Sequence, residues 1–128
     1  MASYDAEVVA YNIVLYSHFV IGTENVPAWI KLRAQATDPD TGAVTASWEL
    51  DCRIRPDSAA VLSPDIHPPA TPGSVGRVYF QKNLREMPIM IDMLRNEKPI
   101  WLHLNGDKKI VVLMTGEEPV GEGELLGG

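Results

Sequence analysis

The sequence predicts an α+β protein, in which a mainly antiparallel, twisted sheet of five or six strands has one short helix packed on it. Apolar and polar residues alternate along two neighbouring segments, Ile30–Thr37 and Val44–Arg55. A period of two is typical of strands with one face in a core and the other in water. Two further apolar segments frame Asn105–Lys108, and only Pro88–Asn96 shows clear helical spacing.

The first pair of segments forms a hairpin whose register can be predicted. If Gly42 takes the positive φ of a three-residue loop, the register opposes Lys31 to Asp51, Arg33 to Glu49 and Ala34 to Trp48. The charge pairs and the small-to-large pair agree with it. Asn25 and Pro27 are also compatible with a helix over Ala28–Ala36. We favour the strand, because a helix would leave Val44–Arg55 without this partner.

A long strand is predicted for Glu7–Ile21, which is rich in tyrosine and β-branched residues. Both of its sides are largely apolar. One side carries Tyr11, Ile13, Leu15, Phe19 and Ile21, and the other carries Asn12, Val14, Tyr16, His18 and Val20. Such a strand is either central in a sheet or covered by another element or another subunit.

The segment Pro56–Gly76 contains five prolines among serine, alanine and glycine, and is predicted to be a loop. Its tip is expected at Asp65–Pro69. A loop of this length is commonly a functional lid or a mobile excursion. Strand character resumes at Val78–Gln81.

The one helix is predicted over Pro88–Asn96, with an inward face of Met90, Ile91, Met93 and Leu94. Two signals compete for its start. Asn83 with Glu86 fits a capping box, whereas Pro88 suits a first turn that begins later. Pro99 ends it.

A second hairpin is predicted from Ile100–Leu104 and Lys109–Thr115 around a four-residue loop. Asn105-Gly106 would ordinarily indicate a two-residue turn. The longer loop pairs apolar residues on both faces, opposing Ile100 to Leu113, Leu102 to Val111, Trp101 to Val112 and His103 to Ile110. The acidic, glycine-rich tail from Gly116 to Gly128 is left open as an edge strand or a mobile end.

Composition is that of a single globular domain of 128 residues with a net charge of −6. Four glutamates of the tail supply much of that charge, and no basic stripe is present, so nucleic acid is not an expected partner. No apolar run is long enough for a bilayer, and the acidic start does not resemble a secretory signal. We therefore expect no membrane association and a cytoplasmic location.

Catalytic chemistry finds little support in the residue pattern. His18, His67 and His103 have no metal-ligand spacing, and no serine lies in a nucleophile motif. Convergence of His18 and His103 with Glu49 or Asp51 on zinc is the weaker alternative to ordinary strand residues. Cys52 is interpreted as a buried side chain. We predict no catalytic residue, no metal and no cofactor.

Function is predicted from the surplus of apolar surface, which exceeds what one helix can cover. The leading hypothesis is a non-catalytic binding protein that forms a homo-oligomer, with interface candidates Trp29, Met90, Met93 and Trp101. The alternative is a small-molecule binder or simple enzyme, with a pocket between sheet and helix under the 56–76 loop. Tyr16, Trp101 and His103 are its candidate lining residues.

Two stretches, Leu94–Pro99 and Glu118–Glu124, resemble small uncharacterised bacterial proteins, including those carried on mobile elements such as integron gene cassettes. In such proteins a short helix runs through "RNEKP" into a terminal hairpin and an "EPVGEGE"-like tail. The resemblance covers about the last third of the chain. It implies a bacterial, cytoplasmic, self-contained domain and carries no catalytic residues over.

Overall fold

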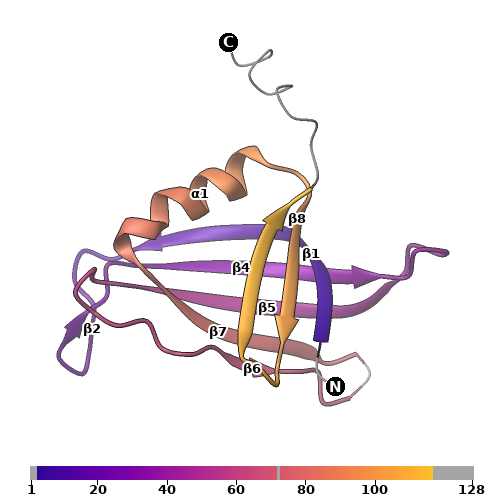
Figure 1. The fold of residues 1–128 in the computed structure, drawn as a ribbon, viewed down its shortest axis with the longest axis horizontal. Coiled ribbons are helices and arrows are strands. Elements are labelled where there is room, and N and C mark those ends of the chain that lie inside the picture. Colours follow the sequence, from indigo (N-terminus) through magenta and orange to yellow (C-terminus); the bar gives the residue numbers. More distant parts are fainter. Residues whose placement is uncertain (1–2, 72, 117–128) are drawn as a thin grey trace, which may run out of the picture.

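The computed structural model describes residues 3–71 and 73–116, and a single seven-stranded sheet dominates it. The strands lie in the order β6-β7-β5-β4-β1-β8-β9, with α1 packed against the sheet (Figure 1). Their bounds are β1 (Ser3–Leu15), β4 (Ala28–Thr37), β5 (Val44–Arg55), β6 (Asp65–His67), β7 (Val75–Asn83), β8 (Ile100–Asn105) and β9 (Ile110–Thr115). A small separate hairpin holds β2 (Val20–Ile21) and β3 (Glu24–Asn25). The turn η1 (Leu84–Glu86) leads into helix α1 (Met87–Asn96).

The α+β class is confirmed, but the sheet is mixed and larger than the five or six strands predicted. Its neighbouring strands are antiparallel except β5 and β7, which run parallel. Parallel neighbours need a connection that returns the chain to the starting end of the first strand. Residues 56–74 provide that return, which explains why so long a segment separates the two strands.

The proline-rich segment is therefore partly different from the prediction. Asp65–His67, expected at the tip of a loop, is the edge strand β6 and pairs antiparallel with Arg77–Tyr79 of β7. The strand predicted over Val78–Gln81 is longer and begins at Val75.

The first hairpin is confirmed in its strands and its register. Lys31 lies opposite Asp51, and Ala34 lies opposite Trp48. Gly42 has φ 73°, and its N–H donates to the Asp38 carbonyl at 2.8 Å. The inner face buries an almost continuous apolar stripe, made of Ala28, Ile30, Leu32 and Ala34 from β4 and Trp48, Leu50, Cys52 and Ile54 from β5. A local hairpin with a glycine loop is thus fixed by its own sequence.

Strand β1 is central, as one of the two predicted alternatives required, but it starts earlier and ends at Leu15 rather than Ile21. The chain turns at Gly22 (φ 63°) to make the β2–β3 hairpin. The apolar pattern suggested one continuous strand up to Ile21 because Val20 and Ile21, which form β2, are also extended.

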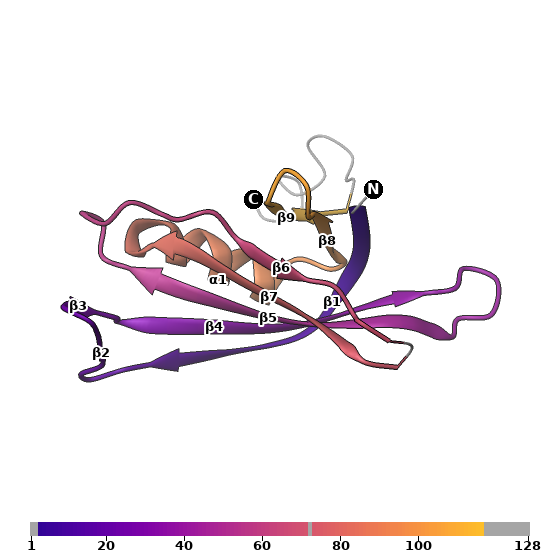
Figure 2. The same ribbon diagram turned by 90° about the horizontal axis from the view of Figure 1, so that it is seen from below.

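The sheet curls where β1 changes its partner. Residues Ser3–Glu7 pair with β8, and Glu7–Leu15 pair with β4, with a bulge between Val8 and Ala10. A bulge bends its strand and increases the local twist. Figure 2 shows the result: β8 and β9 turn up beside α1, on the same side of the β4–β5 layer. The helix therefore lies in the concavity of the sheet, against the core.

Both predicted signals for the helix start are used. Asn83 lies at a capping box before η1, where its N–H donates to Glu86 Oε1 at 3.5 Å, and Pro88 follows in the first turn of α1. Met90 and Leu94 are buried as predicted, and Met87 joins them. Ile91 and Met93 are half-buried.

The register of the second hairpin differs from the prediction by two residues. Leu102 lies opposite Leu113 and His103 opposite Val112, and the four-residue loop runs over 106–109. Asn105 remains in the strand, and its Oδ1 accepts the Lys108 N–H at 2.9 Å. A shift of two keeps every side chain on its face, so the apolar pattern could not distinguish the registers. The prediction for the tail, over residues 117–128, lies outside the described residues.

Among the helices of the described ranges, none combines the length and apolar character required to cross a membrane.

Candidate functional site

Two of the predicted ligand-binding residues, Trp101 and His103, share the outer face of β8. Their neighbours Leu102 and Leu104 face the core and are almost fully buried, whereas Trp101 is 43% exposed. His103 Nδ1 lies 2.7 Å from Asp5 Oδ1 on the adjacent strand β1. Both residues therefore point away from α1, and not into a space between sheet and helix.

The third predicted ligand-binding residue, Tyr16, lies elsewhere. It follows the end of β1 and packs against Phe19, with ring centroids 4.7 Å apart. Trp101 of β8 pairs with Glu7 of β1. Glu7 precedes Tyr16 by nine residues, and all but the last of these belong to the extended strand β1. Nine extended residues span about 30 Å, so the structure does not bring Tyr16 to the other two.

The four predicted interface residues lie on different surfaces. Trp29 is on the outer face of β4, opposite Arg53, and Trp101 is on the outer face of β8. Met90 is in the core, and Met93 is half-buried on the inner side. No single flat surface contains all four.

The outer face of β8 and β9 carries an apolar patch, which we call the hairpin patch. It consists of Trp101, Ile110, Val112 and Met114. Trp101 and Met114 are directly paired across the two strands, and Ile110, Met114 and Trp101 are each more than 40% exposed. The pattern of the second hairpin, apolar on both faces, was the sequence signal for this patch.

A small hollow lies on the opposite, inner side of the same hairpin, and we call it the α1–β9 hollow. Its volume is about 160 Å³. The lining comes from β7, α1 and β9 and from the turn before α1, and consists of Phe80, Lys82, Glu86, Ile89, Met90, Met93, Val111 and Leu113. No described residue of the 56–76 segment lines it. Sequence analysis indicated a space between sheet and helix, but long-range pairing decides which residues surround it.

The outer face of the main sheet is charged and shallow. A polar groove of about 450 Å³ runs over β1, β4, β5 and β7 and includes Lys31, Arg33 and Asp51. Arg77 Nη1 binds Glu49 Oε2 at 2.7 Å in a pair that is about half exposed. Cross-strand charges of opposite sign largely compensate one another here, as is typical of a solvated sheet face.

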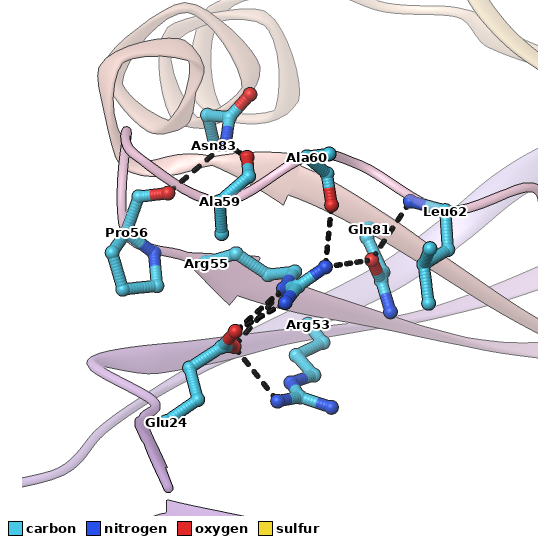
Figure 3. A network of polar contacts seen from close by, with 9 residues as sticks. All are labelled: Glu24, Arg53, Arg55, Pro56, Ala59, Ala60, Leu62, Gln81 and Asn83. Atoms are coloured by element: carbon cyan, nitrogen blue, oxygen red, sulfur yellow. Dashed lines mark hydrogen bonds and ion pairs between the residues drawn. The ribbon is translucent and has the colours of Figure 1, made fainter.

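A partly buried polar network joins four separate segments of the chain (Figure 3). Glu24 accepts hydrogen bonds from Arg53 Nη2 at 2.7 Å and from Arg55 Nε at 3.0 Å. Arg55 also donates to the Ala60 carbonyl and to Gln81 Oε1, which in turn accepts the Leu62 N–H at 3.0 Å. The network ties the β2–β3 hairpin and the start of the 56–74 connection to β5 and β7.

The electrostatics of this network are those of a structural staple. The hydrogen bond from Arg55 lowers the pKa of Glu24, and the same bond raises the pKa of Arg55. All three nitrogens of the Arg55 guanidinium donate to protein oxygens, which leaves little for a ligand. Sequence analysis did not identify the network because its members lie far apart in the chain, and Glu24 falls between two predicted strands.

The candidate nucleophile Cys52 and the histidines His67 and His103 do not form a common site. Cys52 is fully buried, and desolvation raises the pKa of its thiol to about 12, so it remains a neutral core residue. His67 packs edge-on against Tyr79, with ring centroids 6.0 Å apart, and His103 pairs with Asp5. Within residues 3–71 and 73–116, no group of three or more His, Cys, Asp or Glu side chains is arranged to hold a metal ion.

Comparison with known proteins returns no matching family model, no matching curated protein and no matching solved structure.

Proposed function

We propose that this protein is a non-catalytic interaction protein that works as a homodimer, built by antiparallel pairing of β9 with β9 of a second copy. The observation that carries the proposal is that β9 is an apolar edge strand. It is an edge strand of six uncharged residues, Ile-Val-Val-Leu-Met-Thr, and no described residue pairs with its outer edge. Such an edge presents free backbone donors and acceptors to another chain.

The opposite edge of the sheet supports this assignment by contrast. Strand β6 has only three residues, and Pro64 and Pro68 flank it. Short length and flanking prolines are the usual means of preventing edge-to-edge pairing. Among the described residues, one edge of the sheet is protected in this way, whereas β9 has neither the short length nor the flanking prolines.

The sequence of β9 is self-complementary about a two-fold axis at Val112. In that register Val112 faces Val112 of the partner subunit, Ile110 faces Met114 of the partner subunit, and Val111 faces Leu113 of the partner subunit. Every pair is apolar, and no like charges meet. The two hairpin patches become one continuous apolar surface across the axis, which is the surface proposed for further protein partners.

The setting of this function rests on the resemblance to integron-cassette proteins, which supports a bacterial, cytoplasmic origin. A strand pair of this length lies toward the small end of specific interfaces, so we expect a reversible, concentration-dependent dimer.

The test is sedimentation equilibrium over about 1–100 µM, a range suited to a weak interface. We expect wild type to approach twice the chain mass. Val112→Lys places two like charges opposite each other on the axis and should give a monomer, as should Val112→Glu. An equimolar mixture of the two variants should restore a dimer by charge pairing. Val44→Lys, at an exposed site on β5, is the matched control and should leave the dimer intact.

Two outcomes overturn the proposal. One is a wild type that stays monomeric throughout, and the other is a Val112→Lys variant that dimerises as well as wild type. Truncation after Gly116 identifies a competing occupant. If only the truncated chain dimerises, residues 117–128 occupy the edge of β9 in the full chain, and the wild-type protein is not the proposed dimer.

A further inference from the structure

The α1–β9 hollow has the size and lining of a site for a small apolar group. Six of its eight lining residues are apolar, and its volume is about 160 Å³. An apolar protein cavity of about 150 Å³ is large enough to take up benzene. Met90 and Met93 form part of the wall, and their flexible thioether side chains adapt readily to the shape of a guest.

The mouth of the hollow shows a second apolar feature. Ile89 lies on α1 at the rim and is 71% exposed, among the most exposed large apolar residues of the described chain. A ligand that extends from the hollow would cover it. The site can thus hold a guest somewhat longer than the hollow itself.

One charge breaks the apolar pattern, and it lies at the hollow. Along the inner face of β7 the side chains are Gly76, Val78, Phe80 and then Lys82. Lys82 therefore stands where the alternation calls for an apolar residue, and its side chain lines the hollow. The other charged lining residue, Glu86, is the present partner of Lys82. A cation that gives up this partner beside an apolar hollow is the arrangement expected for an amphipathic anion.

The present partner of Lys82 holds it only weakly. Its Nζ is 3.3 Å from Glu86 Oε2, and both side chains are about 40% exposed. Glu86 has a second role, because its Oε1 caps the Asn83 N–H. An exposed pair at this distance contributes little, so Glu86 can turn toward solvent and leave Lys82 to a ligand carboxylate.

We propose that the α1–β9 hollow binds a small amphipathic monocarboxylate, with its apolar body between Met90, Met93 and Leu113 and its carboxylate on Lys82. This inference goes beyond the proposed dimer and does not depend on it, since Val111 and Leu113 face α1 while the hairpin patch faces away. Binding is a simple association without a covalent step.

The test uses hexanoate, with hexanol and hexylammonium as probes of the same length and different charge. The methyl groups of the five methionines, labelled with ¹³C, report the position of binding by NMR. We expect hexanoate to shift the Met90 and Met93 signals saturably and to leave Met114, on the outer face, unchanged. Hexanol should bind more weakly than hexanoate. Hexylammonium is repelled by Lys82 and has only the exposed Glu86 as a partner, so it should also bind more weakly than hexanoate.

Matched variants identify the groups responsible. Lys82→Ala should weaken hexanoate binding about two- to fivefold, the range expected for an ion pair at a partly exposed ammonium, whereas Lys108→Ala in the β8–β9 loop should have no effect. Met93→Trp should fill the hollow and abolish the shifts, with Met114→Trp as its control. Folding of each variant is verified from its NMR spectrum before titration.

Three results would overturn the site: no saturable shift with hexanoate, equal binding of all three probes, or a Lys82→Ala variant with unchanged affinity. The monomeric Val112→Lys variant should still bind hexanoate, so failure of the dimer and failure of the ligand site are separable. If only the chain truncated after Gly116 binds, residues 117–128 are the natural occupant, and the proposal of a free carboxylate is wrong.

Discussion

At the scale of single residues, the packing of Trp48 depends on the small size of its cross-strand neighbours. Trp48 is almost fully buried, with Ala34 opposite it on β4 and Gly76 opposite it on β7. The Tyr4 ring packs over it at 5.0 Å between centroids. A Cβ at position 76 would lie 2.5 Å from Trp48 Cε3, closer than carbon atoms can approach. The indole therefore requires a glycine at this point of the sheet.

Gly76→Ala should accordingly destabilise the protein by about 1–3 kcal/mol, the usual cost of an overpacked core. Urea unfolding of the variant measures this cost. The control is a double-mutant cycle with Trp48→Phe, which removes Cε3 and Cζ3, the two ring atoms nearest to the added Cβ. Gly76→Ala should cost much less in a chain that already carries Trp48→Phe, and equal costs in both backgrounds would contradict the steric explanation.

At the scale of elements, the β8–β9 loop contains a residue in an unfavourable conformation. Lys109 has φ 53°, and it is the only residue other than glycine with positive φ in the described ranges. The left-handed region costs an ordinary residue about 1–2 kcal/mol and costs glycine little. Lys109→Gly should therefore raise stability by roughly 0.5–1 kcal/mol after the added freedom of the unfolded chain is counted. Lys108→Gly, one position earlier, should not. Thermal unfolding checks both, and a Lys109→Gly variant with an unchanged or lower Tm would contradict this account.

The same loop shows why local hairpins differ in how well sequence predicts them. Gly42 marks the left-handed position of the first hairpin, and the predicted register holds. In the second hairpin Gly106 suggests a turn position, but Lys109 takes the positive φ, and the register moves by two. Apolar alternation is unchanged by a shift of two, so only the conformation of the loop could have distinguished the alternatives.

Pairings between distant segments were beyond prediction for a different reason. The parallel pair β5–β7 needs the 56–74 connection to run back along the sheet, and the pair β1–β8 joins residues almost a hundred positions apart. Neither leaves a local pattern in the chain. The candidate site shares this property, since the α1–β9 hollow combines Lys82, Met93 and Leu113 from three elements. The inward face of α1 was predictable from its own spacing, but its opposing wall was not.

At the scale of the whole molecule, the core covers the inner face of the curled sheet, and the Glu24 network joins to the sheet the segments that lie outside this core. The β2–β3 hairpin and the start of the 56–74 connection lie outside the core, and Glu24, Arg55 and Gln81 join both to the sheet. Because the arginine hydrogen bonds lower the pKa of Glu24 in the folded protein, this carboxylate stabilises the fold at neutral pH. The contribution is complete above the unfolded pKa near 4.5 and is lost as the pH falls through the lower folded value.

Glu24→Gln should therefore destabilise the protein at pH 7, by roughly 1–3 kcal/mol for lost hydrogen bonds to a charged group. The difference between wild type and variant should shrink as the pH falls below about 4.5, because wild-type Glu24 then becomes protonated as well. Urea unfolding at several pH values measures the difference directly. Glu7→Gln is the control, since Glu7 makes no ion pair with any described residue, and its small effect should not vary in this way. A Glu24→Gln difference that stays constant down to about pH 3 would mean that the network stabilises the fold by shape rather than by charge.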